Sequence, residues 1–182
     1  AQKILPPKVE SYLQQNWKDF DYDFELSSDG RYVALSLQKG SGSSMVIFDV
    51  SEDKPLYWGS ASFTSGSFSL DSSLFTMNLW DSIKLIDLSS NQQLQSVTVY
   101  EDQRLVPYAS MAISPDLTML AAVIAKDAMS ETVGFIKIND GNLIYQWPVG
   151  NDEINNIRFS EDGKYLFVST HGGWIDILGI YP

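Results

Sequence analysis

A short residue pattern recurs four times along the chain, and this internal repeat constrains the fold more than any other feature. Each copy has an apolar residue, Ser, a variable residue, Asp, two residues suited to turns and two more apolar residues. The copies lie at residues 26–33, 68–75, 113–120 and 159–166. Their aspartates, Asp29, Asp71, Asp116 and Asp162, are 42, 45 and 46 residues apart. Each period is therefore expected to build one supersecondary unit.

The residue types predict a hairpin in each copy. Ser and Asp side chains bond nearby backbone groups in tight turns, and Gly30 and Gly163 can adopt positive φ. Second strands are predicted at 31–37, 73–79, 118–125 and 164–169, and third strands at 45–50, 83–88, 133–138 and 174–180. The second strands are mostly apolar on both faces, as expected for sheets packed between other sheets. The predicted fold is all-β, with β-propeller blades formed by four four-stranded antiparallel repeats.

We expect a single propeller unit over residues 1–182, with blades at about 18–61, 62–101, 105–148 and 153–182. The last repeat stops after its third strand, so its fourth strand must come from elsewhere. Residues 12–17 are a candidate closing outer strand, and we favour a strand over a helix at 9–15. Pairing of 12–17 with 174–180 would close a four-blade ring and remove exposed sheet edges. The alternative, which we favour, is the C-terminal part of a larger propeller.

The repeats resemble those of the WD-repeat β-propeller family, over about residues 12–182. The most specific element is the strand-turn-strand segment 157–168, of sequence IRFSEDGKYLFV. The resemblance implies that Asp29, Asp71, Asp116 and Asp162 stabilise their blades. The family's Gly-His near the blade start is missing, and Phe48-Asp49 and Ile86-Asp87 stand where Trp-Asp would close a blade. The Trp80-Asp81 pair lies between a second and a third strand and is therefore not the family motif.

The inventory of reactive side chains argues against catalysis. The chain has no Cys and one His, His171, which excludes thiolate chemistry and zinc sites built from several Cys or His ligands. No Gly-x-Ser-x-Gly segment is present for a Ser-His-Asp arrangement. The Gly-rich stretch at 39–44 lacks the Gly-Lys-Ser/Thr ending of a phosphate loop. We therefore predict no catalytic, cofactor or metal site.

The predicted binding surface is one loop face of the propeller. That face is formed by loops between second and third strands and by loops that lead into each first strand. Its candidate partner-binding residues are Trp80, Asp81, Tyr108, His171 and Trp174, and Trp and Tyr are residue types that anchor interfaces.

The sequence predicts a non-catalytic protein–protein interaction or scaffolding module. The formal net charge of −11 disfavours nucleic acid and membrane as partners and makes a basic protein the better candidate. Remaining propeller blades and a second copy of the chain are further candidate partners. The alternative function is an accessory propeller of a hydrolase whose catalytic domain lies outside this chain.

Overall fold

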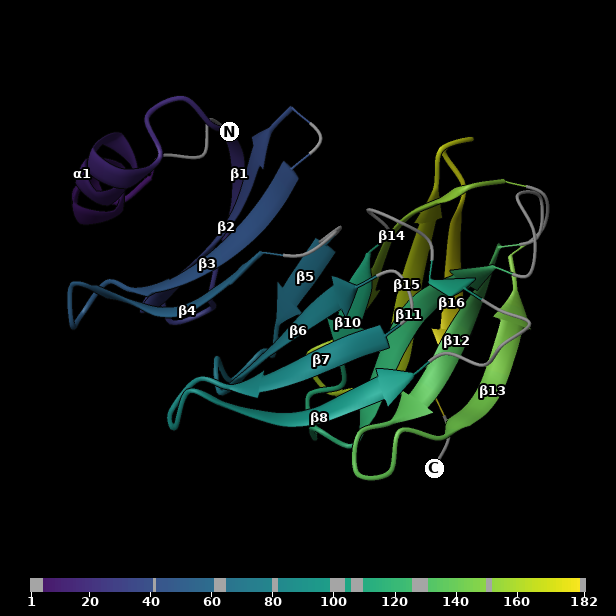
Figure 1. Ribbon diagram of the computed structural model, residues 1–182. Coiled ribbons are helices and arrows are strands. Elements are labelled where there is room, and N and C mark those ends of the chain that lie inside the picture. Colours follow the sequence, from purple (N-terminus) through teal and green to yellow (C-terminus); the bar gives the residue numbers. More distant parts are fainter. Residues whose placement is uncertain are drawn as a thin grey trace. The chain divides into compact units, whose positions relative to one another are not determined.

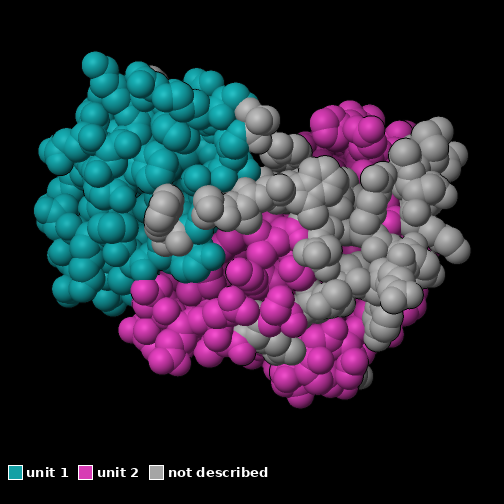
Figure 2. Space-filling view, in the orientation of Figure 1, with its two compact units in different colours: residues 1–63 teal, residues 64–182 magenta. Residues whose placement is uncertain are grey.

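The computed structural model describes residues 5–40, 42–60, 65–79, 82–98, 104–105, 110–125, 131–149 and 152–180. Contacts divide the chain into two compact units, Ala1–Phe63 and Thr64–Pro182, which are coloured separately in Figure 2. Strands dominate both units, and each unit is described by itself (Figure 1). None of the described helices is long and apolar enough to cross a membrane.

The first unit contains a four-stranded antiparallel sheet whose strands pair in chain order. Its strands are β1 (Asp21–Leu26), β2 (Tyr32–Lys39), β3 (Gly42–Asp49) and β4 (Lys54–Ser60). Alternate residues of the central strands, including Val33, Leu35 and Val46, form a buried cluster on one face. That face is covered by a helix, α1 (Pro7–Asn16).

The predictions of an outer strand at residues 12–17 and of a strand at 9–15 are wrong, because α1 occupies residues 7–16. Pro7 stands in the first turn of the helix, where a missing N–H costs nothing. Val9 and Leu13 are four residues apart, so they share one helix face and are buried against the sheet. The ring of Tyr12 lies 5.1 Å from that of Phe48 on β3. The segment therefore packs on the first sheet as a helix.

The described residues of the second unit form three antiparallel sheets. The first has strands β5 (Ser65–Phe68), β6 (Leu74–Leu79), β7 (Ser82–Asp87) and β8 (Gln92–Thr98). The next has β10 (Met111–Ile113), β11 (Met119–Ala125), β12 (Glu131–Lys137) and β13 (Leu143–Pro148), and the short β9 (Arg104–Leu105) also pairs with β11. The last has β14 (Ile154–Phe159), β15 (Tyr165–Thr170) and β16 (Ile175–Gly179).

Apolar side chains fill the spaces between successive sheets of the second unit. Strand β10 contacts both β5 and β14, so the first strands of the three sheets are neighbours (Figure 1). One buried cluster joins Leu74 and Leu85 to Leu120 and Ile124. A second cluster joins the opposite face of β11 and β12 to the last sheet. This stacking of sheets face to face is the arrangement that the repeat predicted.

The four recurring turns have the same hydrogen bonds. In the first, the Ser27 hydroxyl donates to Asp29 at 2.6 Å, the Arg31 N–H donates to Asp29 at 3.0 Å, and the Tyr32 N–H donates to Ser27 Oγ at 2.9 Å. The equivalent Ser–Asp distances at Asp71, Asp116 and Asp162 are 2.6, 2.6 and 2.7 Å. The residue that follows each Asp, namely Gly30, Ser72, Leu117 and Gly163, has a positive φ.

The all-β prediction is confirmed, and each predicted repeat forms its own antiparallel sheet. Among the described residues the last sheet has three strands, as the sequence indicated. The single unit over residues 1–182 stays a prediction, since the two compact units are described separately.

Candidate functional site

The structure describes two of the five predicted partner-binding residues. Trp80, Asp81 and Tyr108 lie outside the described residues. His171 and Trp174 belong to the turn between β15 and β16, and both are exposed. With an exposed fraction of 71%, Trp174 has the largest value among the exposed large apolar residues of the described chain. The candidate site is therefore built around this turn.

Backbone hydrogen bonds fix the shape of the turn. The Gly173 N–H donates to the Thr170 carbonyl at 3.1 Å, and the Thr170 N–H donates to the Trp174 carbonyl at 3.0 Å. Gly173 has a φ of +84°, a conformation that glycine adopts without steric cost. The His171 N–H donates to the Glu153 carbonyl at 2.9 Å, which ties the turn to the residue before β14. A short, hydrogen-bonded turn thus holds Trp174 where its side chain reaches solvent.

Acidic residues border the same turn. The carboxylate of Asp152 lies so close to Gly172 that an added Cβ would overlap it. Asp152 and Glu153 are both exposed. We define the turn surface as Asp152, Glu153, His171 and Trp174. A surface with an exposed indole and acidic residues on one turn is suited to cationic side chains, since an indole face attracts cations and carboxylates pair with them.

The described residues offer little for metal chemistry at this place or elsewhere. Within them, no group of three or more His, Cys, Asp or Glu side chains could hold a metal ion. His171 makes its hydrogen bond to Glu153 through its backbone N–H.

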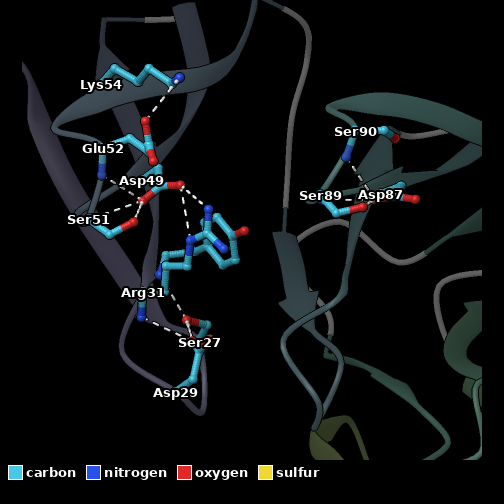
Figure 3. Close-up of polar contacts among 11 residues, drawn as sticks. Ser27, Asp29, Arg31, Asp49, Ser51, Glu52, Lys54, Asp87, Ser89 and Ser90 are labelled. Atoms are coloured by element: carbon cyan, nitrogen blue, oxygen red, sulfur yellow. Dashed lines mark hydrogen bonds and ion pairs between the residues drawn. The ribbon is translucent and has the colours of Figure 1, made fainter.

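An ion pair between the buried Asp49 and the half-exposed Arg31 in the first unit was missed by sequence reasoning (Figure 3). Asp49 is 1% exposed, and its Oδ2 accepts hydrogen bonds from Arg31 Nε at 3.1 Å and Nη2 at 2.9 Å. Its Oδ1 accepts bonds from the Ser51 N–H, the Ser51 hydroxyl and the Glu52 N–H. Burial acts to raise the pKa of Asp49, but these hydrogen bonds outweigh it and lower the pKa from 3.8 to about 2. Asp49 thus fixes the turn between β3 and β4 and ties it to Arg31, which directly precedes β2.

The second sheet repeats half of this arrangement. Asp87 accepts hydrogen bonds from Ser89 and Ser90, as Asp49 does from Ser51 and Glu52. Ser73 occupies the position of Arg31, two residues after the turn aspartate. In the third repeat Lys137 stands where Asp49 stands in the first. The charged pair is therefore a feature of the first sheet, and its fully engaged carboxylate indicates a structural role.

The last sheet has an exposed apolar face that sequence reasoning also missed. Tyr165 and Phe167 on β15 are 46% and 40% exposed, and Ile175 and Ile177 on β16 are 67% and 60% exposed. The strand register places Phe167 beside Ile177 and Ser169 beside Ile175. On β15, apolar residues on both faces of the strand were the available signal, and they predicted burial of both faces.

The sequence of the chain matches no protein family and no curated protein. Solved structures share its fold. The β-propeller domain of Cps50 (Swd1) from Myceliophteria thermophila has a TM-score of 0.67 and 12% identity, and the match covers 100% of this chain and 57% of that one. The sheets are propeller blades.

A second solved structure, hydrazine synthase from Kuenenia stuttgartiensis, has a TM-score of 0.60 and 15% identity. That match covers 86% of this chain and 53% of the synthase chain. The chain thus spans little more than half the length of either structure. At these identities the likeness concerns the fold alone, because propellers of one architecture serve many functions.

Proposed function

We propose that this chain is a non-catalytic protein-interaction module, built from divergent WD-repeat propeller blades, and that the turn surface binds a basic segment of a partner protein. Exposed Trp174 is the observation that carries the proposal. A large aromatic side chain that is 71% exposed leaves apolar surface in contact with water, which is unfavourable in the free protein. Such residues commonly become anchors in interfaces.

The charge of the chain supports a basic partner. The formal net charge is −11, from 23 acidic and 12 basic residues, so long-range attraction favours a positively charged surface. Asp152, whose carboxylate lies beside Gly172, and Glu153, whose carbonyl accepts the His171 N–H, add acidic residues at the border of the turn. Lys or Arg side chains of a partner would pair with these carboxylates and stack on Trp174. Binding of this kind weakens as salt screens the charges.

Site-specific photocrosslinking in the cells that make the protein tests this proposal. A photoreactive amino acid replaces Trp174 in one variant and Ile144, which is 46% exposed on β13, in the control variant. We expect a protein adduct at position 174 that is much stronger than at position 144, with the crosslinked peptide rich in Lys or Arg. Equal labelling at both positions, or adducts spread over unrelated acidic proteins, would refute the proposal.

A further inference from the structure

The exposed apolar face of the last sheet is distinct from the turn surface. We define the last-sheet face as Tyr165, Phe167, Ile175 and Ile177, on β15 and β16. Leu166 and Val168, which alternate with the two aromatic residues, are buried against the preceding sheet. Among the described residues, β16 pairs only with β15, so it is also an edge strand. Contiguous exposed apolar residues of this kind commonly mark an interaction site.

Equivalent faces earlier in the second unit are covered. Tyr165 and Leu74 are equivalent residues, because each lies three residues after the aspartate of its turn, Asp162 and Asp71 respectively. Leu74 is buried in the cluster that joins its sheet to the next one. In the third repeat, Ala121 and Val123 share this face and pack against the last sheet. In the second and third repeats, this face therefore packs against the following sheet.

Each sheet also has an opposite face, which in the later sheets of the second unit packs against the preceding sheet. In the first unit this face of the sheet is covered by a helix. Leu120 and Leu166 lie on that face in their sheets and pack against the sheet before them. Val33 is the equivalent residue of the first sheet, and it is buried beneath α1 together with Leu35. Helix α1 thus takes the place of a preceding blade. It blocks the surface that another chain's last-sheet face would use in a head-to-tail stack.

We propose that the last-sheet face docks on the same face of a second copy of the chain. Because α1 blocks head-to-tail stacking, a two-fold contact between like faces is the arrangement that buries both. Such a contact uses the same patch twice and closes on itself, so it yields a dimer and not a filament. Two sheets of equal strand spacing also pack readily face to face.

Charge and size set the expected strength of this dimer. Among the described residues of the face, the register adds Arg158 beside Phe167, and it places no carboxylate there. Each copy nevertheless has a net charge of −11, so two copies repel at long range and added salt should tighten the contact. Three strands spaced about 4.8 Å apart make a narrow face. It is smaller than the ~800 Å² per partner of a standard interface, which predicts association at micromolar concentrations.

Sedimentation of the purified chain from about 1 to about 300 µM tests the proposal, since this range brackets weak association. We expect a reversible monomer–dimer equilibrium that tightens when the salt concentration rises. Ile177→Lys should weaken dimerisation at least tenfold, because it buries an unpaired cation in the contact. Ile144→Lys, an exposed apolar residue outside the face, should leave dimerisation unchanged.

A crosslinking measurement keeps the test decisive if Ile177→Lys unfolds the protein. The chain has no Cys, so Ile177→Cys and Ile144→Cys each introduce one thiol. A bifunctional maleimide should join two copies through position 177 and not through position 144. A wild-type chain that stays monomeric at every concentration would overturn the proposal and assign the face to a sheet of another protein. Open-ended association, or equal crosslinking at both positions, would also overturn it.

Discussion

Replacement of Asp49 by Asn tests how strongly the buried ion pair holds the first sheet. The substitution keeps the shape of the side chain but removes the negative charge that faces Arg31. Asp49 accepts five hydrogen bonds, two from Arg31, two from Ser51 and one from Glu52. In Asn one of the two carboxylate oxygens becomes an amide nitrogen, so donors on that side lose their acceptor.

The expected loss of stability follows from the cost of breaking the pair and from the pKa shift of Asp49. Breaking one side of a buried ion pair costs about 3–5 kcal/mol, and the half-exposed Arg31, whose side chain is 46% accessible, lowers that figure. The pKa of Asp49 falls from 3.8 to about 2, and a shift of that size corresponds to about 2–3 kcal/mol. We therefore expect Asp49→Asn to lower the free energy of unfolding by about 2–3 kcal/mol at pH 7.

Urea unfolding followed by circular dichroism measures this loss. Asp19→Asn is the matched control in the same unit, since Asp19 pairs with Lys39 at 3.6 Å with its side chain 72% exposed. Exposed pairs contribute little, so the control should change the free energy of unfolding by less than about 0.5 kcal/mol. A loss for Asp49→Asn no larger than that of the control would refute the structural role of the pair.

Three further predictions concern the turns. Lowered pKa values of Asp49, Asp71, Asp116 and Asp162 mean that their stabilising effect is complete above the unfolded pKa near 4 and is lost as the pH falls from there towards 2. The melting temperature should therefore drop over this range, and a constant or rising melting temperature would contradict this. Gly30→Ala should lower the free energy of unfolding by about 1 kcal/mol, because the φ of +72° is unfavourable for a residue with a Cβ even though the surrounding space is open. Gly42→Ala should have little effect, and equal urea midpoints for the two variants would contradict this. Asp116→Ala should lower stability by about 1 kcal/mol through lost turn hydrogen bonds, and more than Asp140→Ala, which removes one such bond; the reverse order in urea unfolding would be inconsistent with the turn geometry.

The repeats, strands and turns were predictable because their signals are local. In each turn the Ser and Asp side chains bond backbone groups within five residues, so the pattern of residue types reports the structure directly. The ion pair was not predictable in this way, because Arg31 and Asp49 are 18 residues apart. Only the pairing of β2 with β3, which sets Tyr32 opposite Asp49, brings them together.

Helix α1 and the last-sheet face depend on tertiary context. The helix has ten residues, and its Val9, Ser11, Tyr12 and Asn16 have weak helix propensity. Packing of Val9 and Leu13 on the sheet decides its conformation. On β15, apolar residues on both faces indicated burial on both. Sequence does not show which face has a neighbour, and in the described structure Phe167 is 40% exposed.

The affinity of the chain for the partner that crosslinks at position 174 tests the central claim most directly. Calorimetric titration would compare the wild-type chain with Trp174→Ala and with the control Ile144→Ala. The proposed anchoring role predicts that Trp174→Ala weakens binding about 30-fold, the equivalent of about 2 kcal/mol for a hot-spot aromatic residue. The control should stay within about twofold of wild type. An unchanged dissociation constant for Trp174→Ala would contradict the account.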